Sequence, residues 1–300
     1  MSPTLLHLLY NLSPVALIGV AVLVFLRARQ TPLWGEAFRR LARNPSARVA
    51  MAVIAIYATI GIADSVGWYD ATTQERRTVI DAIFERKPER TYSAPLAEMT
   101  TGEAKPQKIR EKHILGTDSI GADVLYRTLK GVRTAFQIGG MTVLIVTPLA
   151  LLLGLTAGYY GKWRDDVITY IYTVLSSVPG ILLQIAMVLV LGKGIIQICL
   201  ALGITRWVGL CRMVRGETIK HREREYVRSA KALGVTDMVI LVRHILPNLL
   251  PVVIISTTLG FSNLVLSEAI LSYLGVGVPD NVGSWGNMID AARDELARVP

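Results

Sequence analysis

The sequence is poor in charged residues, cysteine and histidine. Only 18% of its 300 residues are Asp, Glu, Lys or Arg, whereas 52% are hydrophobic and the mean hydropathy is +0.43; soluble domains average about 25% charged residues. A disordered, fibrous or disulfide-stapled chain is therefore excluded. Cys199 and Cys211 share one apolar stretch and are interpreted as small buried side chains, and the four dispersed histidines predict no metal site.

The sequence contains several long runs of residues without any charge. A helix needs about 20 mostly apolar residues to cross the hydrocarbon core of a bilayer. Windows without any Asp, Glu, Lys or Arg cover residues 135–161, 167–192 and 245–267, and weaker windows cover 5–26, 49–66 and 194–211, the last interrupted by Arg206. The pattern predicts an all-α, polytopic transmembrane helix bundle. A signal peptide is the alternative for 5–26, but no basic segment precedes its apolar part, which favours a retained helix.

Basic residues favour the cytoplasmic side for two loops. Residues 27–48 carry six arginines against Glu36 alone, and residues 206–244 carry nine basic against four acidic side chains. Alternation of sides from span to span places both loops in the cytoplasm and the N-terminus outside. The same count places 67–133 outside, where a solvated, loop-rich segment with one short helix near 75–85 is expected.

The second basic loop has internal order. Residues 223–248 show a helical pattern, a glycine and then a second helical pattern. Gly234 suits the position just after a helix, where a positive φ is common; Thr236 or Asp237 can cap the next helix, and Pro247 is expected to limit its continuation. The pattern predicts a helix-turn-helix on the membrane surface.

This loop, at 212–248, resembles the cytoplasmic coupling loop of ABC importer permease subunits. In that family an acidic-Ala-Ala triplet, a glycine four residues later and a later Ile-x-Leu-Pro recur at fixed spacing. Ala230 and Gly234 fit, although Arg228 stands where the family often has an acidic residue. The Arg-His-Ile-Leu-Pro-Asn run ending at Asn248, the stretch 113–133 and the stretch 266–289 resemble the dipeptide and oligopeptide branch in particular.

The resemblance implies a division of the chain and roles for individual residues. The divisions are an extra N-terminal membrane helix with a basic linker (1–48), a first core helix (49–66), an external region (67–134), a core permease bundle (135–275) and an external flap (276–300). In the coupling loop, the expected contacts with an ATPase are apolar at Tyr226, Ala230, Leu233 and Val235 and polar at the rim at Arg228 and Lys231, with Gly234, Asp237 and Pro247 shaping the loop.

Three residues outside the loop are candidates for the pathway or its gate. Pro179 removes a helical hydrogen bond and is expected to kink its span. Glu268 is costly in lipid, so that it faces a pathway or another helix, or else lies near the outer interface. Trp285 and a helix near 287–296 are expected, by resemblance, to form an external flap that contacts a delivered substrate.

The resemblance also implies the partners. They are a second homologous permease subunit, two cytoplasmic ATPase subunits that use ATP and magnesium, an external solute-binding protein, membrane lipid and a peptide solute, in the inner membrane of a bacterium. The chain itself is expected to be no enzyme and to hold no cofactor, because it has no G-x-x-x-x-G-K-[ST] phosphate loop. Peptides, nickel complexes and related solutes share this architecture.

Two other functions stay open. A secondary transporter or channel that works without ATP predicts inverted repeats and pathway-facing charges, of which the sequence shows little, and uptake that follows an ion gradient alone. A DNA-binding helix-turn-helix predicts specific DNA binding by residues 212–248. Apolar spans adjoin this segment on both sides, so no nucleic-acid partner is expected.

Overall fold

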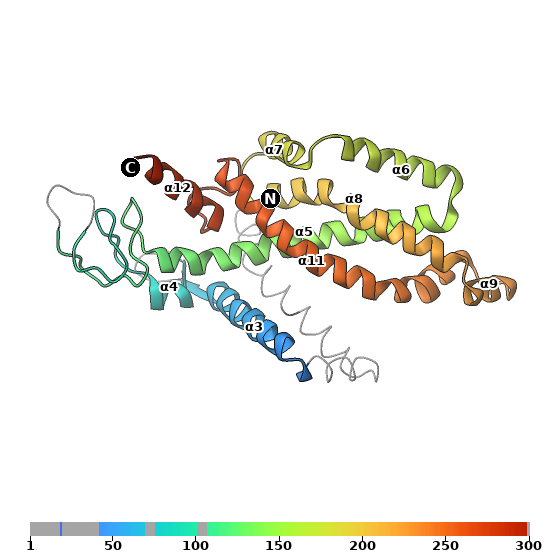
Figure 1. Ribbon diagram of the computed structural model, residues 1–300, viewed down its shortest axis with the longest axis horizontal. Helices are drawn as coiled ribbons and strands as arrows, with labels where there is room; N and C mark the ends of the chain where they lie inside the picture. Colours follow the sequence, from blue (N-terminus) through green and yellow to red (C-terminus); the bar gives the residue numbers. More distant parts are fainter. Residues whose placement is uncertain (1–18, 20–41, 70–75, 101–106, 299–300) are drawn as a thin grey trace. The chain divides into compact units, whose positions relative to one another are not determined.

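The computed structural model describes residues 19, 42–69, 76–100 and 107–298, and these are largely helical (Figure 1). Apart from residue 19, the predicted membrane helix at 5–26 lies outside them, as does most of the basic linker. Four described helices are long and apolar enough to cross a membrane, and a bent helix pair makes a fifth candidate. The predicted all-α transmembrane bundle is confirmed. The chain divides into two compact units, Met1–Gln137 with Pro279–Pro300, and Ile138–Val278.

The first unit begins its described part with α3 (Pro45–Ser65). The side chain of Asn44 accepts a hydrogen bond from the backbone N–H of Ser46 at 3.0 Å, and Pro45 occupies the first turn, where its missing N–H costs nothing. The strands β1 (Gly67–Tyr69) and β2 (Arg76–Thr78) then pair antiparallel. The helix expected over 49–66 is therefore present and starts slightly earlier, because its capping residues precede the apolar run.

The short helix α4 (Val79–Phe84) begins with a capping box. The hydroxyl of Thr78 accepts from the backbone N–H of Asp81, and the Asp81 carboxylate accepts from the backbone N–H of Thr78 at 2.7 Å. The helix predicted near 75–85 exists, but its expected first residues form strand β2. The pairing of β2 with β1 satisfies backbone groups that a longer helix would otherwise use.

Lys130 joins three helices of the first unit. It lies on α5 (Val124–Tyr160), and its Nζ is 2.7 Å from Asp64 Oδ1 on α3 and 2.6 Å from Asp81 Oδ1 on α4. Both carboxylates are buried. Burial opposes ionisation of Asp81, but hydrogen bonds from Lys130 and from the backbone of Thr78 outweigh it and hold the pKa of Asp81 below its ordinary 3.8.

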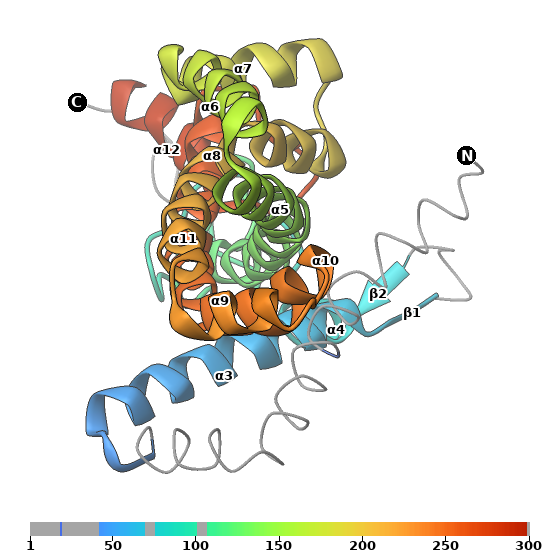
Figure 2. The same cartoon turned by 90° about the vertical axis from the view of Figure 1, so that its right-hand side faces the viewer.

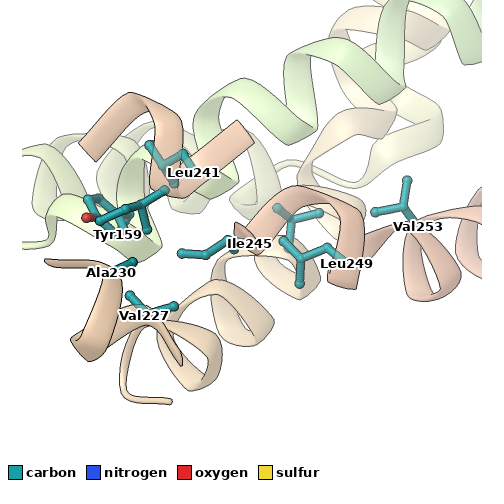
Figure 3. Packing of buried hydrophobic residues seen from close by; sticks show 9 residues of the cluster. Tyr159, Val227, Ala230, Leu241, Ile245, Leu249 and Val253 are labelled. Carbon is teal, nitrogen blue, oxygen red and sulfur yellow. The ribbon is translucent and has the colours of Figure 1, made fainter. Parts of the chain in front are cut away.

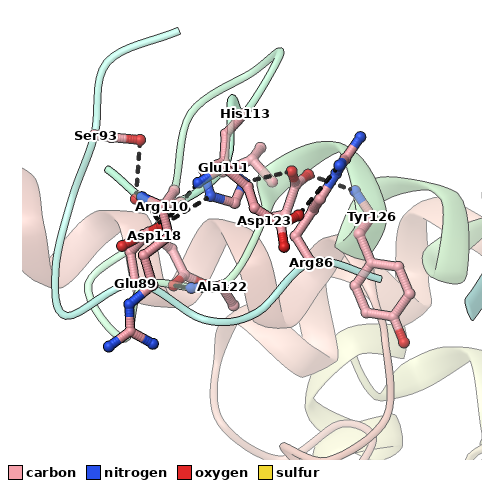
Figure 4. A network of polar contacts seen from close by, with 12 residues as sticks. Arg86, Glu89, Ser93, Arg110, Glu111, His113, Asp118, Ala122, Asp123 and Tyr126 are labelled. Atoms are coloured by element: carbon pink, nitrogen blue, oxygen red, sulfur yellow. Dashed lines mark hydrogen bonds and ion pairs between the residues drawn. The ribbon is translucent and has the colours of Figure 1, made fainter. Parts of the chain in front are cut away.

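The region between α4 and α5 is irregular but contains a buried polar network (Figure 4). His113 Nδ1 lies 2.7 Å from Asp123 Oδ2, and both side chains are buried. The carboxylate of Glu89, also buried, accepts from the backbone N–H of Arg110 at 2.8 Å. The expected loop-rich segment is present, and the sequence did not reveal that these polar groups leave water and bind one another.

The second unit contains the rest of α5 and the helices that follow it. They are α6 (Lys162–Ser177), α7 (Gly180–Leu191), α8 (Ile195–Arg222), α9 (Glu225–Ala232), α10 (Asp237–Val239), the π-helix η1 (Ile240–Ile245) and α11 (Leu246–Tyr273). Cys199 and Cys211 on α8 are free and buried, as predicted. Figure 2 shows α9 and α10 at one end of this unit, where α8 ends and η1 begins.

A sharp bend interrupts the uncharged window 167–192. Helix α6 ends at Ser177, α7 begins at Gly180, and their axes meet at 89°. The prediction that Pro179 kinks this span is confirmed, and the bend divides the window into two helices. Hydropathy counts apolar residues over the window and is insensitive to such a break; proline lacks the N–H and clashes with the preceding turn.

Candidate functional site

The turn after α9 has the geometry that the sequence predicts. Gly234 has φ +77°, its N–H donates to the carbonyl of Lys231 at 3.1 Å, and the N–H of Val235 donates to the carbonyl of Ala230 at 3.1 Å. This pair of bonds is a Schellman motif, which ends a helix with a residue in the left-handed region. Since only glycine adopts that region without a steric cost, the position fixes where α9 stops and how the chain turns.

One face of α9 packs into the unit's own core. Val227 and Ala230 are buried and lie with Tyr159, Ile245 and Leu249 in one apolar cluster (Figure 3). The cluster connects α9 to the end of α5 and to the start of α11. A force applied to α9 would therefore reach both long helices through packed side chains.

Several large apolar side chains on α9, on its turn and on the segment that follows are exposed, next to the charged residues of α9. Leu233 is 83% exposed and Met238 65% exposed, and Val242 and Tyr226 are exposed as well. These four residues, Tyr226, Leu233, Met238 and Val242, are called the docking face below. Large apolar side chains this exposed, within one short stretch of the chain, indicate a binding surface.

The docking face differs from the predicted one in two places. Ala230 is buried, and Val235 is partly buried against the apolar cluster, so neither is available to a partner in the way expected. Met238 and Val242 are exposed instead, and neither was predicted from the sequence. The helical spacing of Met238 and Val242 is the signal that could have found them, since residues four apart share a helix face.

Charged and polar groups surround the docking face and hold it in place. Arg228 is exposed and forms an ion pair with Glu223 at 3.0 Å; this guanidinium, with that of Arg222, lowers the pKa of Glu223. Lys231 is exposed and its Nζ lies 5.4 Å from the centre of the Tyr159 ring. Both basic residues are exposed near the docking face, and their contact with a partner stays a prediction.

Two hydroxyl contacts fix the ends of the turn. The Tyr159 hydroxyl donates to Asp237 Oδ1 at 2.6 Å, which ties the start of α10 to the end of α5. The Tyr226 hydroxyl lies 2.7 Å from His221 Nδ1 on α8, and partial burial raises the pKa of Tyr226. Asp237 therefore acts within the chain, through Tyr159, while Thr236 occupies the cap position without a side-chain hydrogen bond.

Pro247 does not end the second helix of the predicted helix-turn-helix. The chain is helical from Asp237 to Tyr273, with η1 directly before α11 and Pro247 in the first turn of α11. A proline is tolerated in a first helical turn, and the π-helical segment before it already departs from regular bonding. The predicted surface helix is consequently the first part of a membrane-spanning helix.

Arg206 does not belong to the basic loop to which its charge was assigned. It lies inside α8 rather than after it, and α8 continues to Arg222. Charge counting cannot separate an arginine within a helix from one in the adjacent loop.

The three pathway candidates lie apart along the chain and have different surroundings. Pro179 is exposed at the α6–α7 break. Glu268 is 2% exposed, and its carboxylate accepts a hydrogen bond from Ser272 at 2.7 Å. Trp285, at the start of α12 (Trp285–Arg298), donates from Nε1 to the carbonyl of Thr128 at 3.0 Å. The predicted flap helix is therefore present, and its tryptophan is anchored within the first unit.

No group of three or more His, Cys, Asp or Glu side chains in the described ranges is arranged to hold a metal ion. The site offers an apolar face, basic rim residues and a rigid connection to two long helices. Those features suit the binding of another protein.

Comparisons with known proteins relate this chain to transport proteins. A family model described as "binding-protein-dependent transport system inner membrane component" matches residues 150–295. The chain is 32% identical, over 89% of its length and 80% of the relative, to the dipeptide transport system permease protein DppC of Alkalihalophilus pseudofirmus. It is 29% identical, over 89% of its length and 80% of the relative, to the oligopeptide transport system permease protein OppC of Bacillus subtilis.

Two further similarities cover less of the chain. The glutathione transport system permease protein GsiD of Pectobacterium atrosepticum is 36% identical over 63% of this chain and 62% of the relative. Among solved structures, one of the MetNI methionine ABC transporter in inward-facing conformations contains a chain with a TM-score of 0.49 and 19% identity, over 59% of this chain and 84% of that chain.

Proposed function

Because the chain belongs to the family of binding-protein-dependent transport system inner membrane components, we propose that it is the membrane-spanning permease subunit of an ATP-driven importer of di- or oligopeptides. It is an integral protein of the bacterial inner membrane, with several helices able to cross it. Relatives named as dipeptide, oligopeptide and glutathione permeases support a peptide solute.

The family works with ATPase and solute-binding partners in general. In the proposed assembly this chain pairs with a second homologous permease, and the two together form the path. Two cytoplasmic ATPase subunits hydrolyse ATP with magnesium, since this sequence has no phosphate-binding loop of its own. An external solute-binding protein delivers the peptide.

The exposure of Leu233 supports a role of the docking face in contact with an ATPase subunit. Full burial of a leucine contributes about 2 kcal/mol, and Leu233 is 83% exposed at the tip of a rigid turn. The back of α9 is packed on Tyr159 and Ile245. Movement of a partner bound to this face would displace α5 and α11 together, as rigid elements, and so change access to the path.

The test replaces Leu233 in the assembly reconstituted into liposomes. Leu233→Asp puts a charge at the centre of the docking face and should lower ATP-dependent peptide uptake at least tenfold, with less ATPase subunit recovered on purification. Leu233→Met keeps the side chain apolar and is the matched control. Because the side chain is exposed, neither substitution should change the free energy of unfolding by more than about 0.5 kcal/mol. Full uptake and full ATPase recovery in Leu233→Asp would refute the proposal.

A further inference from the structure

Arg206 is a charged residue deep within a membrane-spanning helix. It is 11 residues beyond Ile195, the first residue of α8, which places its Cα about 16 Å along the helix axis. Half of a hydrocarbon core is about 15 Å. An arginine at this depth is costly unless it faces water, protein or a bound ligand, and such residues commonly mark a solute pathway.

A neutral hydroxyl group holds the Arg206 side chain. Its Nη2 donates to Ser267 Oγ on α11 at 2.5 Å, and the Ser267 hydroxyl donates in turn to the backbone carbonyl of Asn263 at 2.8 Å. Ser267 is buried, whereas Arg206 is exposed. Within the part of the chain that the structure describes, no carboxylate forms an ion pair with Arg206, so its positive charge has no counter-ion while the Ser267 hydroxyl holds its side chain.

The two helix faces that Arg206 and Ser267 belong to carry small and polar residues and leave open space at two glycines. One face of α8 carries Arg206, Gly209 and Met213, and one face of α11 carries Ser256, Gly260, Asn263 and Ser267, each set at the three- and four-residue spacing of a helix face. The two faces meet at both ends: at the Arg206 contact described above, and where Ser256 Oγ lies 2.9 Å from Met213 Sδ. A Cβ added to Gly209 or Gly260 would meet nothing within 4 Å.

The direction of the side chain fits entry from outside. Helix side chains point toward the N-terminal end of their helix, which for α8 is the end at Ile195. The alternation of basic loops places that end on the external side. The guanidinium therefore meets a solute that arrives from outside before that solute reaches the cytoplasmic half of the helix.

We propose that Arg206 binds the carboxylate of the solute in transit, and that it makes the path selective for peptides with a free C-terminal carboxylate. The inference rests on the proposed function as a peptide permease. A guanidinium pairs with a carboxylate through two parallel hydrogen bonds, and it does so most strongly where water is scarce. Ser267 is a positioning residue that orients the guanidinium.

Uptake of two matched probes tests this role. Trialanine and trialanine amide differ only in the C-terminal carboxylate, and their ATP-driven uptake is measured in liposomes that contain the complete assembly. Each rate in Arg206→Gln is divided by the wild-type rate for the same probe, so that any preference of the solute-binding protein cancels. A charged hydrogen bond carries enough free energy for the trialanine ratio to fall about tenfold, while the amide ratio stays near one.

Two further variants separate charge from structure. Arg206→Lys keeps the charge and should retain part of the trialanine uptake. Arg212→Gln removes an arginine from the same helix, where it contacts Ser176 on α6 instead, and should leave the preference unchanged. Equal losses for both probes in Arg206→Gln, with less of the second permease recovered, would assign Arg206 to a subunit contact and overturn the proposal, as would no loss for either probe.

A labelling experiment tests the same residue without any transported peptide. Arg206→Cys is made in a background in which the buried Cys199 and Cys211 are alanine. A membrane-impermeant, negatively charged methanethiosulfonate added outside should modify the new cysteine, because the proposal places it in an aqueous path. Absence of modification overturns the inference whatever the solute is, whereas modification without trialanine uptake by the wild type would show that the proposed peptide specificity has failed instead.

Discussion

Removal of the Lys130 ammonium group should loosen the part of the first unit around α4. In Lys130→Met the carboxylates of Asp64 and Asp81, which lie 2.7 and 2.6 Å from Nζ, lose their shared cation. Their side chains are only 2% and 8% exposed. Breaking a buried ion pair from one side costs about 3–5 kcal/mol, and we expect the lower value because Lys130 is itself one-fifth exposed.

Hydrogen exchange of α4 measures this loss directly. A cost of about 3 kcal/mol corresponds to roughly a hundredfold faster opening, since 1.4 kcal/mol is a factor of ten. The backbone amides of Val79–Phe84 should therefore lose about two orders of magnitude of protection, because Asp81 caps this helix. Lys87→Met, at an exposed position of the same region, is the control. It should change the free energy of opening by less than about 0.5 kcal/mol.

The pH dependence gives a second test with a defined sign. In the wild type the pKa of Asp81 is lower folded than unfolded, so its contribution is present above pH 3.8 and is lost as pH falls through the folded pKa. Without Lys130, burial should raise that pKa, and acidification from pH 7 toward pH 4 should restore part of the lost stability. Unchanged protection at pH 7, or a deficit that grows on acidification, would refute the reasoning.

Three further substitutions test other contacts. Tyr159→Phe removes the 2.6 Å hydrogen bond to Asp237 and should destabilise the protein by about 1.5 kcal/mol; an unchanged thermal midpoint by circular dichroism would contradict this. Gln184→Leu removes an amide whose Oε1 is buried without a partner among the described residues, so the same measurement should show equal or higher stability. Gly121→Ala should make the irregular region between α4 and α5 sensitive to limited proteolysis, because φ is +74° and the new Cβ would collide with the Glu89 carbonyl; unaltered resistance would argue against the clash.

Local rules made much of the fold and one part of the site predictable. Gly234 was placed at the end of α9 from the neighbouring residues alone, since a Schellman turn is determined by a few consecutive residues and by the freedom of glycine. The long helices followed from uncharged windows, because a bilayer demands about 20 apolar residues in succession. The kinked position at Pro179 followed from the missing N–H of proline.

Contacts between distant parts of the chain were not predictable in the same way. Ala230 and Leu233 are both apolar and near the same turn, yet one is buried and the other is 83% exposed. Only the packing of α9 on α5 and α11 decides between them. The same holds for His113 and Asp123, whose pairing depends on how an irregular segment folds back, and for Arg206, whose partner Ser267 lies on another helix.

Photo-crosslinking from the docking face tests the central claim most directly. A benzophenone amino acid is placed at position 233 in a complete assembly that keeps its transport activity. It should crosslink mainly to the ATPase subunit, and the yield of that crosslink should change when ATP is added. A crosslink to the external solute-binding protein, or none to the ATPase in an assembly that still transports peptide, would contradict the account.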